Sequence, residues 1–200
     1  IKKANVSTLY CVLANSGSTV QRINLKGERF SHPLLSGGKV FVVDESVLKA
    51  FVVEDGSTKW ASEIQANADF YPVITANTVA QVCSGNKLVV LHPNSGAIKW
   101  ACQFDSPLYQ PLINGNLLLV ARRSATQNVT VVDALDVSQG TTQWSTVLQG
   151  ELATDFSANS NAICMVTKGA KQGCMVYCLS SKNGELLWKK GVVLSVPIER

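Results

Sequence analysis

The eleven residues ALDVSQGTTQW, from Ala134 to Trp144, indicate the fold of this chain. They begin as an apolar strand, break at Ser138-Gln139-Gly140, and reach a tryptophan four residues after the glycine. A glycine at this place is expected in a tight turn between two strands, where a positive φ is needed. Trp144 then lies on the following strand, where a large flat side chain can bury about 150–250 Å².

The same spacing of glycine and tryptophan recurs along the whole chain. The copies are NSGSTVQ (15–21), EDGSTKW (54–60), NSGAIKW (94–100), SQGTTQW (138–144) and KNGELLW (182–188). All four tryptophans fall on this register, 40, 44 and 44 residues apart, and Gln21 takes the place of tryptophan in the first copy. An internal repeat of this length is typical of propellers and other repeat folds.

Each period contains four short segments that are rich in Val, Leu and Thr and bounded by Gly, Asn, Ser or Pro. Such segments are typical of strands, and no stretch of ten residues shows helical periodicity. Four short antiparallel strands per 40–45 residues indicate a propeller blade. We therefore predict an all-β propeller with turns at Gly17, Gly56, Gly96, Gly140 and Gly184, and packing between blades by Trp60, Trp100, Trp144 and Trp188.

Residues 134–140 followed by Trp144 resemble the pyrroloquinoline-quinone (PQQ) repeat, the tryptophan-docking motif Ala-x-Asp-x-x-Thr-Gly-x-x-x-Trp of quinoprotein-type propellers. The other copies depart from it: Val52 replaces the Asp of the second copy, and Cys178 replaces the Ala of the last. The resemblance covers nearly the whole chain. It implies the propeller fold, and its nearest functional analogue is the non-catalytic lipoprotein subunit of the outer-membrane protein assembly machine. These repeats also build enzymes, so the resemblance alone does not fix a function.

We expect a single propeller domain over residues 1–200. Its blades are predicted at 28–66, 67–106, 107–150 and 151–190, with a further blade formed by 1–27 and completed by 191–200. Val196-Pro197-Ile198 supports this closure because it resembles the blade-opening segments HPL, YPV and QPL. Closing the ring would remove both sheet edges. Two arrangements stay open: five closed blades, or a fragment of a seven- or eight-bladed propeller.

The composition excludes several classes of protein. Hydrophobic residues make up 46% of the chain and charged residues 16%, and the net charge is +4 without a basic run. A disordered chain and a nucleic-acid-binding protein are therefore not expected. No apolar run approaches the roughly 18–20 residues of a membrane span, so membrane association is expected only through a partner or a lipid anchor. The family resemblance favours an exported protein, periplasmic or lumenal.

The six cysteines fit the repeat better than they fit a disulfide framework. Cys11 and Cys178 fall on the small third-strand position that Ala50 and Ala134 occupy, and Cys164 lies on a second strand. Small buried thiols are the expected state, with one or more disulfides as the alternative. Cys174 and Cys178 are too far apart to pair, about 13 Å along one strand. With only two histidines and no C-x-x-C, no zinc site is expected.

No catalytic, cofactor-binding or metal-binding residue is predicted. Quinoprotein dehydrogenases hold the quinone with a calcium-binding acidic cluster, a catalytic Asp and often two adjacent cysteines. This chain has no adjacent cysteine pair and no carboxylates convincingly placed for acid–base work. We expect a non-catalytic scaffold that binds protein partners, with no cofactor and no small-molecule ligand. The alternatives are a quinoprotein dehydrogenase or a fragment of one, and a lumenal or sensor domain of a eukaryotic protein, which glycosylation at Asn5 or Asn128 would support.

Two loops between second and third strands are longer than their counterparts and account for the 44-residue periods. One carries Arg122 and Arg123, and the other carries Lys168 and Lys171. Inserted loops on one face of a repeat protein often carry its binding function. We therefore predict that these four basic residues contact a protein partner.

Overall fold

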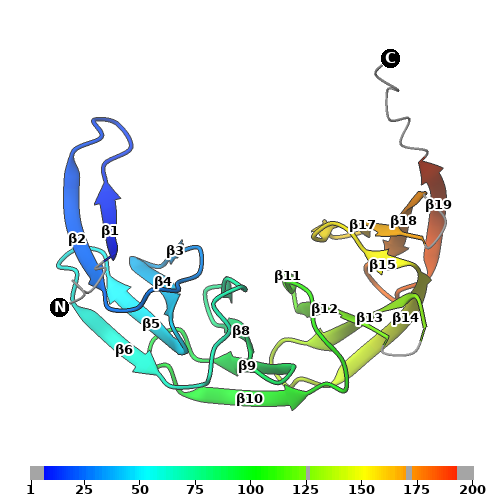
Figure 1. The fold of residues 1–200 in the computed structure, drawn as a ribbon, viewed down its shortest axis with the longest axis horizontal. Helices are drawn as coiled ribbons and strands as arrows, with labels where there is room; N and C mark the ends of the chain where they lie inside the picture. The colour runs from blue at the N-terminus through cyan, green and yellow to red at the C-terminus, as the bar shows by residue number, and fades with distance from the viewer. Residues whose placement is uncertain (1–6, 125–126, 170–172, 193–200) are drawn as a thin grey trace. The chain divides into compact units, whose positions relative to one another are not determined.

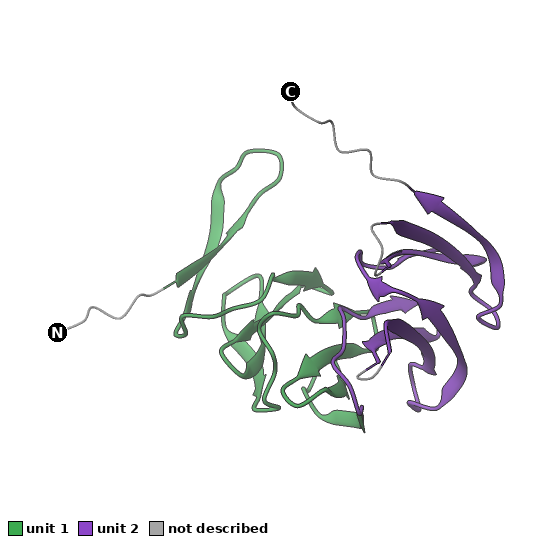
Figure 2. Cartoon of the chain, turned by 45° about the vertical axis from the view of Figure 1, so that its right-hand side comes forward, with its two compact units in different colours: residues 1–103 green, residues 104–200 purple. Residues whose placement is uncertain are grey.

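The computed structural model describes residues 7–124, 127–169 and 173–192. The chain divides into two compact units, residues 1–103 and 104–200, which are described separately below (Figure 2). All named elements are strands, which confirms the predicted all-β class. In the described ranges, no helix has the length and apolar character needed to cross a membrane. Asn5, Lys171 and Val196-Pro197-Ile198 lie outside the described residues.

Unit 1 contains a two-stranded hairpin followed by two four-stranded antiparallel blades (Figure 1). The hairpin consists of β1 (Ser7–Val12) and β2 (Thr19–Leu25). Blade 1 consists of β3 (Leu34–Ser36), β4 (Lys39–Asp44), β5 (Val47–Val52) and β6 (Thr58–Ser62). Blade 2 consists of β7 (Val73–Ile74), β8 (Val79–Cys83), β9 (Lys87–Leu91) and β10 (Ile98–Gln103).

Unit 2 contains two further blades in which consecutive strands again pair antiparallel. Blade 3 consists of β11 (Leu112–Asn114), β12 (Leu117–Arg123), β13 (Val129–Asp136) and β14 (Thr142–Gln149). Blade 4 consists of β15 (Glu151–Leu152), β16 (Ser157–Ala158), β17 (Ala162–Lys168), β18 (Cys174–Ser180) and β19 (Leu186–Val192). In blade 4, β15 and β16 both pair with β17, so two short strands share the first position of this sheet.

The central strands of each blade carry most of the core. Strand β8 is buried along its whole length, and β4 is buried from Val40 to Asp44. Strands covered on both faces are mostly apolar because neither face meets water. Gln81 of β8 and Asp44 of β4 are the buried polar residues of these two strands. The fourth strands β6 and β14 instead bury only occasional residues, among them Trp60 and Trp144. The tryptophans therefore lie at the border between the core and the exposed outer strands.

Neighbouring blades share hydrophobic cores. The core between blades 1 and 2 includes Phe41, Ala50, Trp60, Val79, Val89 and Leu91. The hairpin packs on blade 1 through Ile23, Leu25, Val42 and Phe51. The core between blades 3 and 4 includes Leu119, Ala134, Trp144, Ile163, Met165 and Leu179. Within each unit, the two blades are thus stabilised by burying sheet faces against each other.

The predicted burial of the cysteines is only partly correct. Cys83 and Cys178 are buried, whereas Cys11, Cys102, Cys164 and Cys174 are half-buried. Cys11 has the register position of Ala50 in its repeat, but the hairpin lacks the first two strands that would flank it in a full blade. All six thiols are free.

Candidate functional site

Trp60 and Trp144 dock onto the glycine turn of the blade that follows them. Trp60 Nε1 donates to the carbonyl oxygen of Pro93 at 3.0 Å, and its ring covers Gly96. Trp144 makes the equivalent bond to the carbonyl oxygen of Ser181 at 3.3 Å and covers Gly184. A Cβ at position 96 would lie 2.6 Å from the indole carbon Cε3, so the turn needs glycine for space as well as for its φ of 69°.

Gln21 occupies the tryptophan position of the hairpin and makes a similar contact. Its side chain lies against Gly56 of blade 1, where a Cβ would approach Gln21 Cδ to 2.8 Å. The amide group is held by its own strand, since Arg22 N donates to Gln21 Oε1 at 2.9 Å. Gln21 therefore covers the glycine turn at Gly56, as tryptophans cover the equivalent turns at Gly96 and Gly184.

The other two tryptophans have different surroundings. Trp100 is half-buried on β10, opposite Val90. Trp188 is 49% exposed, compared with 9% for Trp60 and for Trp144. Gly17 has the same backbone conformation as the docked turns, with a φ of 67°, but no atom lies within 4 Å of where its Cβ would be. Trp188 and Gly17 are therefore exposed members of the repeat within the described chain.

A bulge precedes the tryptophan position in every repeat, a feature that the sequence did not reveal. In β14, Trp144 is opposite Ala134 and Thr142 is opposite Leu135, so Gln143 is an extra residue. The corresponding extra residues of the other repeats are Val20, Lys59, Lys99 and Leu187. A bulge redirects the side chains on either side of it. Here it sets the direction in which the docking side chain leaves the strand.

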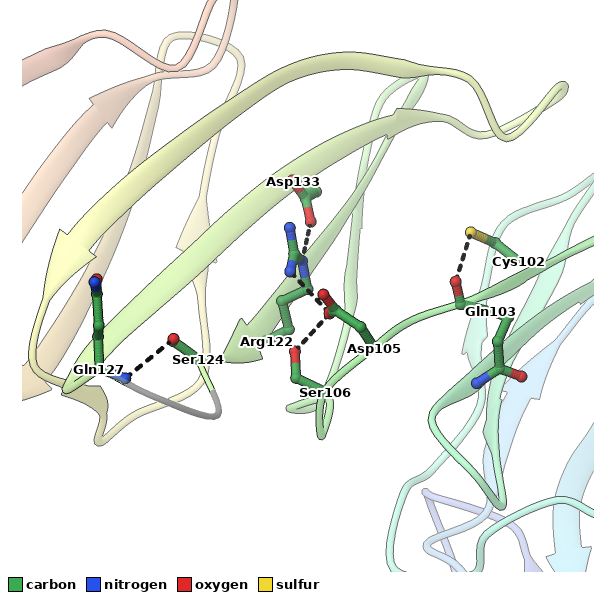
Figure 3. Close-up of polar contacts among 8 residues, drawn as sticks. All are labelled: Cys102, Gln103, Asp105, Ser106, Arg122, Ser124, Gln127 and Asp133. Atoms are coloured by element: carbon green, nitrogen blue, oxygen red, sulfur yellow. Dashed lines mark hydrogen bonds and ion pairs between the residues drawn. The ribbon is translucent and has the colours of Figure 1, made fainter.

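Arg122 lies at the centre of an ion-pair cluster in unit 2 (Figure 3). Its Nε bonds Asp133 Oδ2 at 2.8 Å, and its Nη1 bonds Asp105 Oδ1 at 3.1 Å. Ser106 Oγ also donates to Asp105 Oδ1, at 3.0 Å. The hydrogen bond to Asp133 raises the pKa of Arg122, against the effect of burial. Arg122 therefore joins β12 to β13 and to the segment that enters blade 3.

Blade 1 contains the same arrangement with the charges exchanged. Asp44 occupies on β4 the register position of Arg122 on β12, and Lys49 occupies that of Asp133. Lys49 Nζ donates to Asp44 Oδ2 at 2.5 Å, and the Gly27 amide donates to Asp44 Oδ1 at 2.9 Å. Both acidic–basic pairs thus join the two central strands of their blade diagonally. One residue of each pair also bonds the segment that precedes the blade, at Gly27 in blade 1 and at Asp105 in blade 3.

The hydrogen bonds of Asp44 determine its protonation. Burial alone would raise the pKa of this carboxyl group, but the bonds from Lys49 and from the amides of Lys26 and Gly27 outweigh burial. Its pKa is consequently lowered. The carboxylate is 2% exposed and fully engaged, so it serves the structure of unit 1 rather than offering a reactive acid.

The four basic residues predicted to bind a partner have different positions. Arg122 belongs to the internal cluster above, and Arg123 ends β12 with Nη1 3.1 Å from Glu151 Oε1. Lys168 is exposed at the end of β17, opposite Glu151 in the strand register. Lys171 lies outside the described residues. Arg123 thus pairs with Glu151, Lys168 is a register neighbour of Glu151, and Arg122 pairs with acidic residues of its own unit.

The described ends of the two predicted loops border one pocket of about 820 Å³ in unit 2. Gln127 and Asn128 line it from the loop between β12 and β13, and Gly169 and Gly173 from the loop between β17 and β18. Its walls also include apolar side chains, among them Met175, Tyr177 and Val192. The described ends of the two inserted loops therefore border the same pocket of adjacent blades.

A calcium-bound quinone would need clustered oxygen ligands. Across residues 7–124, 127–169 and 173–192, no three His, Cys, Asp or Glu side chains lie close enough together to hold a metal ion. His32 stacks on Tyr71 with ring centroids 5.9 Å apart and borders a pocket of about 310 Å³ in unit 1. This contact occupies one face of the imidazole.

Comparison with known proteins places the chain in a family. A family model described as outer membrane protein assembly factor BamB matches residues 4–189. The chain belongs to this BamB family. The match confirms the resemblance to PQQ-like propellers that the Gly–Trp repeat indicated. Sequence comparison with curated proteins finds no match.

Three solved structures share the fold of this BamB-family chain at low sequence identity. BamB from Moraxella catarrhalis has a TM-score of 0.66 at 17% identity, over 94% of this chain and 62% of its own. Quinohemoprotein alcohol dehydrogenase ADHIIG from Pseudomonas putida HK5 has 0.65 at 13%, over 80% and 33%. The computationally designed protein Ika8 has 0.68 at 14%, over 88% and 53%. The chain spans less than two thirds of the length of each.

This set of neighbours shows that one fold serves an assembly factor, an alcohol dehydrogenase and a designed protein. Family membership therefore establishes the architecture of the chain, and a function must be argued from particular sites. Sequence inspection missed the two ion-pair clusters of blades 1 and 3. Placing the four repeats in one register would have found them, because Asp44 and Arg122 then share a column, as do Lys49 and Asp133.

Proposed function

We propose that the chain is a non-catalytic propeller scaffold that binds a protein partner within an envelope or membrane-associated assembly, and that it acts after export. The observation that carries this proposal is the pocket of unit 2 that is bordered by Gln127 and Asn128 from one inserted loop and by Gly169 and Gly173 from the other. Loop ends that are positioned by the strands of two adjacent blades suit protein recognition, since the sheets provide a rigid support for them.

The chemistry of the pocket supports a protein partner. Its lining combines apolar residues with the polar residues Gln127, Asn128 and Gln149. Interfaces between proteins typically combine an apolar centre with a polar rim. The family description as an outer-membrane assembly factor points to the same class of role. The expected partner is a component of an outer-membrane protein assembly machine.

Position-specific photo-crosslinking in the native protein tests the proposal. A photoreactive residue at Gln127 borders the pocket, whereas one at Ser138 lies beyond the other end of β13 as a matched control. We expect one discrete adduct from position 127, identified by mass spectrometry as an assembly component, and none from position 138. The substitution Val192→Asp in the pocket wall should abolish the adduct. Equal adducts at both positions, or none at 127, contradict the proposal.

Charge reversal tests the basic residues separately. Arg123→Glu and Lys168→Glu change exposed side chains, and adding Lys171→Glu completes the second loop. Partner binding should weaken in this triple variant, and unchanged binding would exclude a role for these charges. Arg122 is unsuitable for this test, because reversing it would break its pair with buried Asp133.

The quinoprotein alternative has one supporting observation, the likeness to the alcohol dehydrogenase of Pseudomonas putida. Native mass spectrometry of the protein from its source, with added pyrroloquinoline quinone and calcium, distinguishes the two functions. A stoichiometric quinone adduct would favour the enzyme over the scaffold. A glycan on Asn128, which is exposed, would instead favour a lumenal domain of a eukaryotic protein.

A further inference from the structure

The strand register aligns one row of four residues across each blade. In blade 1 the row is Leu34, Phe41, Ala50 and Trp60, and in blade 3 it is Leu112, Leu119, Ala134 and Trp144. Residues directly opposite one another in a sheet project from the same face. In both blades the row is apolar and ends in the docking tryptophan.

Blade 4 departs from this pattern at the two central positions. Its row is Ser157, Cys164, Cys178 and Trp188. Two thiols therefore replace the apolar pair that β4 and β5 contribute in blade 1, and β12 and β13 in blade 3. Among the six cysteines, all of which are described, only these two face each other in the register.

The two sulfur atoms are in contact. Cys164 Sγ lies 3.0 Å from Cys178 Sγ, and both thiols are free. Opposed residues on antiparallel strands have Cα atoms about 4.5–5.5 Å apart. A disulfide requires a Cα separation of about 4.4–6.8 Å, so the backbone register already suits a bond between them. Closing it needs a small movement of the side chains and no change of strand pairing.

The two thiols differ in access. Cys164 is half-buried, whereas Cys178, on the strand between β17 and β19, is 4% exposed. Burial and the contact with Cys164 raise the pKa of the Cys178 thiol to about 11. An external reagent therefore reaches Cys164 first, and Cys178 is placed to resolve whatever forms on it.

We propose that Cys164 and Cys178 form a redox-active dithiol that closes to a cross-strand disulfide by exchange with a small disulfide such as oxidised glutathione. The Cys164 thiolate attacks one sulfur of the oxidant, forming a mixed disulfide and releasing one glutathione thiolate. The Cys178 thiolate then attacks Cys164 Sγ and displaces the second glutathione thiolate. Two protein thiols lose two electrons and two protons, and one glutathione disulfide becomes two glutathione thiols.

Two alanine variants separate the roles of the thiols. Other blades of this chain already have alanine at the two equivalent positions, so both variants are expected to fold. Cys178→Ala introduces the residue that blades 1 and 3 carry at this place, Ala50 and Ala134. Cys164→Ala introduces the residue that blade 2 carries, Ala80 opposite Val90. Cys174→Ala is the control, because Cys174 faces Lys168 and Val192.

The test incubates the native protein with oxidised and reduced glutathione at pH 8.5, followed by alkylation and peptide mass spectrometry. We expect a disulfide linking Cys164 to Cys178 in the wild type and in Cys174→Ala. The Cys178→Ala variant should accumulate glutathione on Cys164. In the Cys164→Ala variant, Cys178 should be glutathionylated at least about tenfold less than Cys164 is in Cys178→Ala, because Cys178 is buried. The proposal is overturned if both thiols remain alkylatable at every glutathione ratio, or if Cys174 takes part in the disulfide.

Discussion

At the scale of single residues, the tryptophans occupy equivalent sequence positions but unequal environments. Trp60 and Trp144 are each 9% exposed and hydrogen-bonded to the following blade, whereas Trp188 is 49% exposed. A residue contributes to stability in proportion to the surface that it removes from water and the contacts that it fills. The sequence motif therefore specifies where the tryptophan lies on its strand. How much the tryptophan stabilises the fold depends on whether a neighbouring blade covers it.

Alanine substitution at these positions should reveal the difference. Trp60→Ala and Trp144→Ala should each lower the free energy of unfolding by about 3–5 kcal/mol, as expected for a buried aromatic residue. Trp188→Ala should lower it by less than about 1 kcal/mol, since its ring is half-exposed. Urea unfolding followed by circular dichroism measures all three. Equal losses for Trp60 and Trp188 would contradict the docking geometry.

Asp44 should make unit 1 sensitive to acid. Its lowered pKa means that the folded protein binds a proton less readily than the unfolded chain, where the value is near 3.9. Its stabilising effect is therefore complete above about pH 4 and is lost as the pH falls through the lowered folded pKa. Asp44→Asn should cost roughly 3 kcal/mol at pH 7, and the difference from wild type should shrink below pH 4.

Urea unfolding between pH 7 and pH 3 tests this expectation. Asp69→Asn is the matched control, because Asp69 pairs with Arg29 on the surface, with side chains 68% and 64% exposed. An exposed pair contributes little, so this variant should follow the wild type within about 1 kcal/mol at every pH. A constant deficit for Asp44→Asn down to pH 3 would show that the carboxylate charge is not responsible.

At the scale of elements, the bulge before each tryptophan links the strand to the docking contact. The extra residue Gln143 lets β14 place Trp144 opposite Ala134 while the turn at Gly140 stays closed by the bond from its amide to the Asp136 carbonyl oxygen at 2.8 Å. In a strand, a shift of one residue turns every side chain to the opposite face. The bulge therefore allows the closed turn at Gly140 and the docked orientation of Trp144 to exist together.

After deletion of Gln143, the closed turn at Gly140 and the docked orientation of Trp144 should no longer be possible together. Either the turn or the direction of Trp144 must change, so the loss should resemble that of Trp144→Ala, about 3–5 kcal/mol. The substitution Gln143→Ala keeps the bulge and serves as the control, with an expected change below about 1 kcal/mol. Urea unfolding of both variants provides the measurement. A deletion that behaves like the substitution would exclude this role for the bulge.

At the scale of the whole molecule, the outer strand β19 has no strand beside it beyond β18 in the described chain. All seven of its residues are exposed, including Leu186, Leu187 and Trp188. Leu186, Leu187 and Trp188 form an exposed apolar segment at this edge, followed by Lys189 and Lys190. An exposed apolar segment at a sheet edge favours contact with another chain, whereas edge lysines oppose it. We predict that residues 1–200, prepared as a separate chain, associate with a second copy through the apolar segment Leu186–Trp188 as their concentration rises.

Sedimentation velocity over a range of concentrations measures this association. Leu187→Lys should raise the Kd by about tenfold or more, because burial of one leucine contributes at least about 1.5 kcal/mol and the added charge repels a second copy. Leu35→Lys on β3 is the control, since Leu35 is 70% exposed at a different strand. A chain that remains monomeric at all concentrations would contradict the expectation.

The sequence by itself determined the repeat, the all-β class and the positions of the glycine turns. These features depend on local chemistry: period-two strand patterns, the freedom of glycine at positive φ, and the regular spacing of Trp60, Trp100, Trp144 and Trp188. The glycine turn recurs in all five copies and the tryptophan in four of them, so each copy supports the assignment of the others.

Only the tertiary structure decided which residues meet. The bulge at Gln143, the exchanged ion pairs of Asp44 and Arg122, and the contact between Cys164 and Cys178 all depend on the strand register. Register joins residues that are distant along the chain, and it is set by how blades pack rather than by local preference. The exposure of Trp188 has the same origin, because a side chain is buried only where a neighbouring blade covers it.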